Sequence, residues 1–144
     1  RISPPLGIKI SYMKMVSDES LISQLTQELP TTDIVLALPD PNVYNKNTAR
    51  PLLLATYKHS VPIFAYSQAF IDAGATLGIY TLPDQFAQQC IELIAENQSP
   101  ATSHWPSAAK PKYYTIGINA AVAESLGINL PSIQHLRAQL DRTQ

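Results

Sequence analysis

The chain has 144 residues, of which 45% are hydrophobic and 15% are charged, and its formal net charge is −1. This is the composition of a folded domain rather than of a disordered chain, and a domain of this size buries roughly 68–70% of the surface that its unfolded chain exposes. The 10 basic and 11 acidic residues form no runs, which argues against a nucleic acid or an anionic membrane as the partner.

The chain opens with a strand pattern followed by a helix pattern. Ile8, Ile10 and Tyr12 alternate with other residues and predict a first strand. Ser17 is a candidate N-cap for a helix that Pro30 would end. The apolar face of this helix is expected to consist of Leu21, Ile22, Leu25 and Leu29.

The alternation of strand and helix repeats over the next forty or so residues. Residues 34–38 are an apolar run that stops at Pro39, which predicts a strand buried on both faces. A helix is expected over Ala49–Lys58, with Pro51 tolerated in its first turn. Residues 61–66 then predict another buried strand.

A short helix over residues 69–73 is expected to end at Gly74, before a strand over residues 75–80. A longer helix should start at Pro83 and run to about residue 97. We expect its core face to be formed by Phe86, Cys90, Leu93 and Ile94. Residues 98–112 are rich in proline and predict a long crossing segment on the surface.

The last part of the chain predicts a strand and two capped helices. Residues 113–118 alternate as a strand does, Asn119 can cap a helix over residues 120–126, and Ser132 can cap a final helix. Strands that alternate with helices predict an α/β fold, a three-layer sandwich with a mostly parallel sheet of four to five strands. The length fits one domain, residues 1–144.

Few residues carry a recognisable catalytic or metal-binding signal. None of the phosphate-binding, nucleophile-elbow or zinc-protease motifs occurs. His59, His104 and His135 are far apart among polar neighbours and are expected to be surface imidazoles, and Cys90 a buried structural thiol. We therefore expect no metal site, no cofactor and no enzymatic activity.

Asp40 and Asn42 are the first candidates for ligand contacts. They follow the strand at residues 34–38, and ligands of open parallel sheets bind outside the carboxyl ends of the strands. A carboxylate can accept hydrogen bonds from an amine, and an amide can both donate and accept. The alternative is that both side chains only stabilise the turn, as Asx residues commonly do.

A second group of candidates follows the next strand. Tyr66 offers an aromatic face or a phenol and Ser67 a hydroxyl, while Gly74, near the start of the strand at residues 75–80, is a place where a ligand could approach the backbone. A helix C-cap is the alternative role for Gly74. With Asp40, these residues predict three strand ends that present polar groups on one edge of the sheet.

Four segments together resemble a known family. They are DIVLALPDPNVYN, VPIFAYSQAFIDAGATLGIY, the helix that starts at Pro83, and IGINAAVAESLGINLP. This pattern resembles the second half of the substrate-binding proteins of ABC transporters, in the group that includes tryptophan-type and other uncharacterised uptake systems. The spacing from Asn119 through Leu126 and Gly127 to Pro131 is its most specific part.

The resemblance implies one lobe of a type I periplasmic binding protein, in which two α/β lobes close on a small ligand. Residues 8–97 would be the core lobe, residues 98–112 a crossing segment, and residues 113–144 a terminal strand-helix segment that packs on a missing first lobe. Asp40, Tyr66, Ser67, Gly74 and Ala75 would face the cleft between the lobes.

The resulting hypothesis is a periplasmic or exported solute-binding protein that acts by hinge closure. Its partners would be a small amino-acid-like ligand, the missing first lobe or a second subunit, and a membrane permease. The alternative hypothesis is a ligand-sensing or protein-interaction domain of a signalling protein, with a vestigial cleft.

Overall fold

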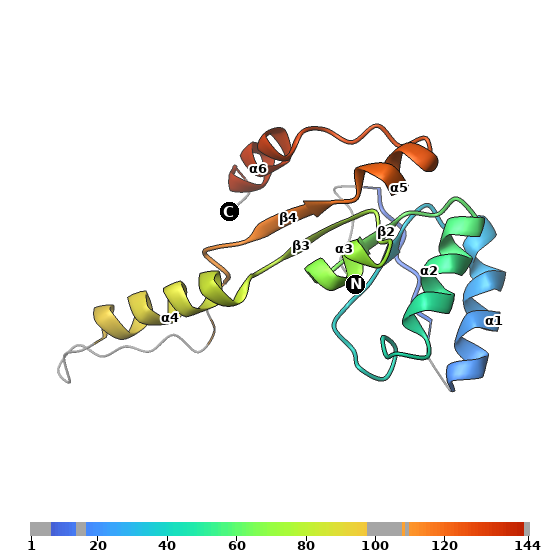
Figure 1. The fold of residues 1–144 in the computed structure, drawn as a ribbon, viewed down its shortest axis with the longest axis horizontal. Helices are drawn as coiled ribbons and strands as arrows, with labels where there is room; N and C mark the ends of the chain where they lie inside the picture. Colours follow the sequence, from blue (N-terminus) through green and yellow to red (C-terminus); the bar gives the residue numbers. More distant parts are fainter. Residues whose placement is uncertain (1–6, 14–16, 98–107, 109, 143–144) are drawn as a thin grey trace.

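The computed structural model describes residues 7–13, 17–97, 108 and 110–142. Its sheet has four strands in the order β1-β2-β3-β4: β1 Val35–Leu36, β2 Ile63–Ala65, β3 Leu77–Tyr80 and β4 Thr115–Ile118 (Figure 1). The first three strands are parallel, and β4 runs antiparallel to β3. Helices lie on both sides of this sheet, which confirms the predicted α/β class with a mostly parallel sheet.

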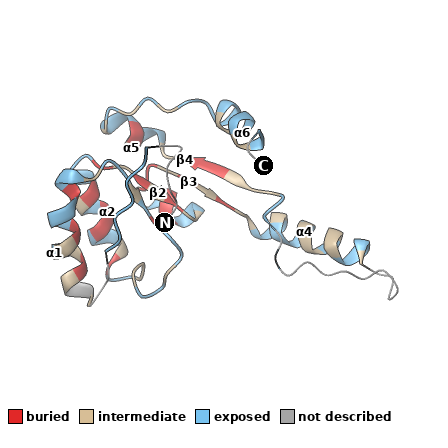
Figure 2. Ribbon diagram, turned by 180° about the vertical axis from the view of Figure 1, so that it is seen from behind, coloured by how far each residue is buried: buried red, intermediate tan, exposed pale blue. Residues whose placement is uncertain are grey.

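The hydrophobic core is formed by the sheet, by the helices α1 Asp18–Glu28 and α2 Ala49–Lys58, and by Phe70 and Ile71 of the segment after β2 (Figure 2). Leu21 and Leu52 are 1% and 2% exposed, and Ile63 of β2 is 2% exposed. Apolar side chains spaced three and four residues apart put one stripe of each helix on the sheet. The predicted bounds of α2 are confirmed, and so is the apolar face of α1 at Leu21, Leu25 and Leu29.

Local signals in the sequence explain where α1 starts and ends. The Ser17 hydroxyl accepts a hydrogen bond of 3.2 Å from the Ser20 amide, and the Ser20 hydroxyl accepts one of 3.0 Å from the Ser17 amide. This reciprocal cap satisfies two amides that have no partner within the helix. The α-helix ends at Glu28, and a 3₁₀ turn over Leu29–Thr31 contains Pro30.

Burial of β1 differs from the prediction. Ile34, Leu36 and Leu38 are 48%, 60% and 61% exposed, whereas Ala37 is 2% exposed. The prediction of a strand buried on both faces is therefore wrong. The physical reason is that β1 is the edge strand of the sheet and presents its outer face without a layer of described residues against it.

The predicted first strand is also wrong. Residues 7–13 form no strand, and Ile8 and Tyr12 are 62% and 82% exposed. A strand needs a neighbour to bond its amides and carbonyls. None of the described strands pairs with this segment, so it lacks the hydrogen-bonded neighbour that a strand requires.

The later helices are α3 Gln68–Asp72, α4 Pro83–Glu96, α5 Ala120–Ser125 and α6 Ile133–Asp141. Side chains of Ser67, Asn119 and Ser132 cap α3, α5 and α6, and the last two caps were predicted. The Asn119 side chain also donates a 3.0 Å hydrogen bond to the Ile71 carbonyl, which ties α5 to α3. Of the predicted crossing segment, residues 98–107 and 109 lie outside the described residues.

The prediction that α4 presents a core face is wrong for this chain. Phe86 and Ile94 are 65% and 55% exposed, and Cys90 is half-buried rather than buried. Figures 1 and 2 show the reason: α4 projects away from the sheet, at the far end of β3 and β4. Among the described helices, none has the length and hydrophobicity that crossing a membrane requires.

Candidate functional site

Asp40 and Asn42 lie in the turn that follows β1, and the hydrogen bonds of this turn use the Asp40 side chain and the main chain of both residues. The Asp40 carboxylate accepts a 2.9 Å hydrogen bond from the main-chain amide of Asn42, and the Asp40 carbonyl accepts bonds from the main-chain amides of Val43 and Tyr44. Asp40 is half-buried and Asn42 is exposed. The turn-stabilising role is therefore present for the Asp40 side chain, and it occupies one carboxylate oxygen while the other has no partner among the described residues.

Three rings meet beside this turn and form what we call the aromatic cluster: Tyr44, Tyr66 and Phe70. The rings of Tyr66 and Phe70 stack with centroids 5.6 Å apart, and Tyr44 packs edge-on against both at 5.7 and 5.2 Å. Such pairs stabilise a fold by roughly 0.5–1.5 kcal/mol each beyond their buried area. Sequence reasoning singled out Tyr66 as a candidate for ligand contacts but not Tyr44 or Phe70, and Tyr44 comes from a different segment, the turn after β1.

The surroundings of Tyr44 keep its phenol protonated. Burial, and then the neighbouring Tyr66 and Asp40, raise the pKa of Tyr44 from 10.0 to about 12. Desolvation disfavours the phenolate, and nearby negative charge disfavours it further. At neutral pH the cluster therefore offers uncharged rings and hydroxyl groups next to the carboxylate of Asp40.

Ser67 and Gln68 follow β2 at the same edge of the sheet. The Ser67 hydroxyl accepts a 3.3 Å hydrogen bond from the Phe70 amide and so caps α3. The Gln68 side chain accepts a hydrogen bond from the Tyr80 hydroxyl and donates one of 2.8 Å to the Asp72 carboxylate. Tyr80 is 8% exposed, so this connection fixes the start of α3 against the end of β3.

Gly74 and Ala75 lie at the opposite edge. They precede β3, which runs parallel to β2, so the start of β3 lies beside the start of β2 and away from Ser67. The expectation that all three strand ends share one edge is right for Asp40 and Ser67 and wrong for Gly74. Gly74 has a φ of 123° and ends α3, which is the capping alternative, and Ala75 has no exposed surface.

Two hollows in the surface lie away from these residues. The larger, of about 500 Å³, lies between the end of β4, α5 and residues 127–131. The smaller, of about 150 Å³, lies where α6 meets the residues before β4 and includes Arg137 and Asp141. Neither hollow is lined by Asp40 or Tyr66, so the candidate residues and the two hollows are separate parts of the surface.

The described histidines, His59 and His135, are both exposed, as predicted; His104 lies outside the described residues. Within residues 7–13, 17–97, 108 and 110–142, no three His, Cys, Asp or Glu side chains come together in a way that could hold a metal ion.

Comparison with known proteins supports the fold alone. No family model matches the sequence, and no curated protein is similar enough to count as a relative. The chain is similar to a crystal structure described as a conserved domain protein from Vibrio cholerae O1 biovar eltor, with a TM-score of 0.65 and 22% identity. The match covers 91% of this chain and 44% of that one, so the chain spans less than half the length of its structural neighbour.

Proposed function

We propose that this chain is one lobe of an exported substrate-binding protein of an ABC transporter, which binds a small solute without chemically converting it. The observation that carries the proposal is the position of Asp40 beside the aromatic cluster, outside the carboxyl ends of β1 and β2. Ligands of open α/β sheets bind at this edge. The sequence resemblance to the second half of such proteins supports the same function.

The chemistry of this edge favours an amino-acid-like ligand. The second carboxylate oxygen of Asp40 can accept a hydrogen bond from an ammonium group, and the half-buried Tyr66 offers an aromatic ring in the same cluster as Tyr44. One lobe buries much less of a ligand than an enclosed site does. Binding would therefore need a second lobe, and ligand contacts to both lobes would stabilise the closed state.

Calorimetry of the full-length gene product with amino acids and related small solutes tests this proposal. Asp40→Asn keeps an oxygen for the turn but removes the charge, so it should weaken binding by about 10- to 100-fold while the fold is retained. Asp33→Asn removes an equal charge at the other end of β1 and should leave affinity unchanged. Absence of binding by the unmodified protein to every solute in the set would count against the proposal.

A ligand-sensing or protein-interaction domain is the second candidate. Two hydrogen bonds favour this candidate: the Asp40 carboxylate is used in the turn, and the Ser67 hydroxyl caps α3. In a vestigial cleft, the side chains of the former site would serve only the fold, as these two do. The sequence of the parent gene separates the two candidates. A sensor would continue into a membrane helix and a signalling module, whereas a transport protein would not.

A further inference from the structure

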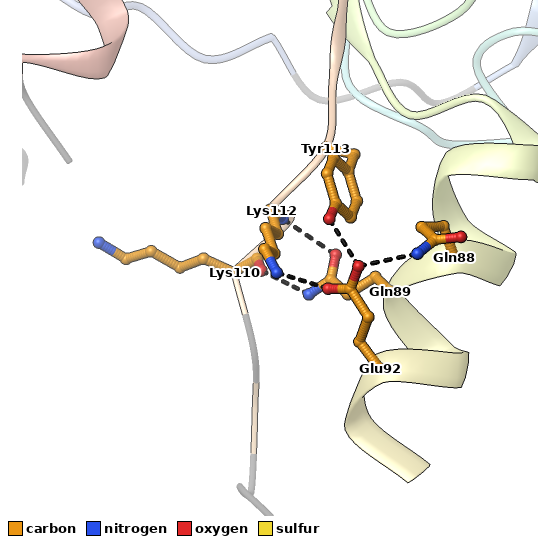
Figure 3. A network of polar contacts seen from close by, with 6 residues as sticks. All are labelled: Gln88, Gln89, Glu92, Lys110, Lys112 and Tyr113. Atoms are coloured by element: carbon orange, nitrogen blue, oxygen red, sulfur yellow. Dashed lines mark hydrogen bonds and ion pairs between the residues drawn. The ribbon is translucent and has the colours of Figure 1, made fainter. Parts of the chain in front are cut away.

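Helix α4 has one polar face, and side chains on this face form hydrogen bonds with the segment that leads into β4. Figure 3 shows the Glu92 network, which consists of Gln88, Gln89, Glu92, Lys110, Lys112 and Tyr113. Glu92 accepts hydrogen bonds of 2.6 Å from the Tyr113 hydroxyl and 2.8 Å from Gln88, and its other oxygen is 2.5 Å from the Lys112 ammonium. Gln89 bonds the Lys110 carbonyl and the Lys112 amide, each at 2.9 Å.

The network fixes the rotation of α4 about its axis. Gln85, which bonds the Leu82 amide and the Thr115 hydroxyl, lies on the same face as Gln88, Gln89 and Glu92. Residues three, four and seven apart share one face of an α-helix. The segment that leads into β4 therefore occupies this side of α4, and the opposite side must point away from it.

That opposite side is apolar, and we call it the α4 apolar face. At about 3.6 residues per turn its members spread over roughly 160° of the helix surface. Phe86, Ile91 and Ile94 are 65%, 62% and 55% exposed. The full set is Phe86, Ala87, Cys90, Ile91, Leu93 and Ile94.

A stripe of this width is typical of a helix that packs on a protein core. Large contiguous apolar patches are rarely left open on soluble proteins and mark interaction sites. In Figures 1 and 2, α4 projects from the body of the molecule, to which β3 and β4 connect it. The apolar face is thus presented where the described part of the chain does not cover it.

We infer that the α4 apolar face packs into the core of a second α/β lobe carried by the same, longer polypeptide. This inference rests on the proposed function. It assigns Pro83–Glu96 to the side of the second lobe, and it makes the β3 and β4 ends near Thr81 and Tyr113 the connection between the lobes. The Thr81 hydroxyl donates to the Tyr113 carbonyl at 3.2 Å, so the two connecting segments are joined at this point.

The dimensions favour a lobe over a second copy of this chain. A helix of 14 residues is about 21 Å long, and one helix packed on its equal buries less than the roughly 1,200 Å² that a specific stable interface needs. A lobe, unlike a single helix, can contact the α4 apolar face from several sides at once. The structural neighbour also has more than half of its length outside the match to this chain, which is enough for such a lobe.

Cysteine labelling of the full-length gene product tests the inference. In a Cys90→Ser background, Ile94→Cys places a thiol on the α4 apolar face, and Leu54→Cys places one on the exposed side of α2 as the matched control, since Ile94 and Leu54 are 55% and 52% exposed. The reagent is 5,5′-dithiobis(2-nitrobenzoate), and the rate in the Cys90→Ser protein is subtracted. We expect the thiol introduced by Ile94→Cys to react at least about ten times more slowly than the control thiol, because labelling on a covered face needs local opening.

Three results would overturn the inference. One is equal labelling at both positions. Another is a gene product that carries no further domain. The third is a protein dimer, seen by light scattering, that Ile94→Glu converts to monomers, since the occupant would then be a second copy. Ligand binding is measured separately on the same protein, so labelling at equal rates with binding intact would contradict this inference and leave the proposed function standing.

Discussion

Gly78 of β3 lies so close to Ala65 of β2 that a Cβ atom on Gly78 would stand 2.4 Å from the Ala65 carbonyl oxygen. The two residues are partners in the parallel ladder, so neither can move without disturbing it. Gly78→Ala should therefore lower the free energy of unfolding by about 2–3 kcal/mol. Chemical denaturation followed by circular dichroism measures this loss.

Gly117→Ala on β4 is the comparison for this variant. Its Cβ would meet side-chain atoms instead, at 2.9 Å from the ring and hydroxyl of Tyr80 and 3.1 Å from Ile71. Side chains can shift more readily than a strand backbone, so the loss should be smaller than for Gly78→Ala. Equal losses would show that contact with the main chain of β2 is not what makes Gly78 necessary.

Two leucines of α2 provide a second prediction about stability. Leu52 is 2% exposed and lies in the core, whereas Leu54 is 52% exposed on the same helix. Leu52→Ala should cost about 2–5 kcal/mol through lost burial and a cavity. Leu54→Ala should change stability by no more than about 0.5 kcal/mol. A similar loss for both variants, measured by denaturation, would contradict the assigned orientation of α2.

The helices of the core could be predicted because their signals are local. Ser17 and Pro30 mark the limits of α1, and the spacing of Leu21, Leu25 and Leu29 identifies its buried side. The burial of Leu36 and Phe86 could not be predicted in the same way. Hydrophobic periodicity identifies the face that needs a partner, but it does not say whether that partner belongs to the same segment of chain.

The candidate site was predictable only in part, for a geometric reason. Asp40 and Ser67 follow parallel strands and thus share an edge, as the sequence pattern indicates. Gly74 instead precedes β3, and the start of a parallel strand lies at the opposite edge of the sheet from the strand ends. The edge at which Gly74 lies could therefore have been predicted from its position before its strand. The contacts of Tyr44 with Tyr66 and Phe70 depend on loop conformation, which periodicity does not encode.

The Glu92 network should weaken in acid. Hydrogen bonds from Lys112, then Tyr113 and Gln88, lower the pKa of Glu92 from 4.5 to about 2. A lowered pKa in the folded state means that the stabilisation is complete above pH 4.5 and is lost as the pH falls towards 2. NMR signals of the Lys112 amide and the Tyr113 ring should follow this loss. Glu92→Gln should remove the titration, and Glu96→Gln on the same helix should leave it in place.

Tyr44 should make the aromatic cluster sensitive to alkali. Burial raises its pKa from 10.0 to about 12, so the folded protein favours the neutral phenol more than the unfolded chain does. The resulting stabilisation is complete below pH 10 and is lost as the pH rises towards 12. In denaturation curves at increasing pH, the unmodified protein should lose stability more steeply over this range than Tyr44→Phe, which keeps the ring contacts with Tyr66 and Phe70 but cannot ionise. Identical pH profiles would contradict the assignment of Tyr44 to a desolvated position beside Asp40.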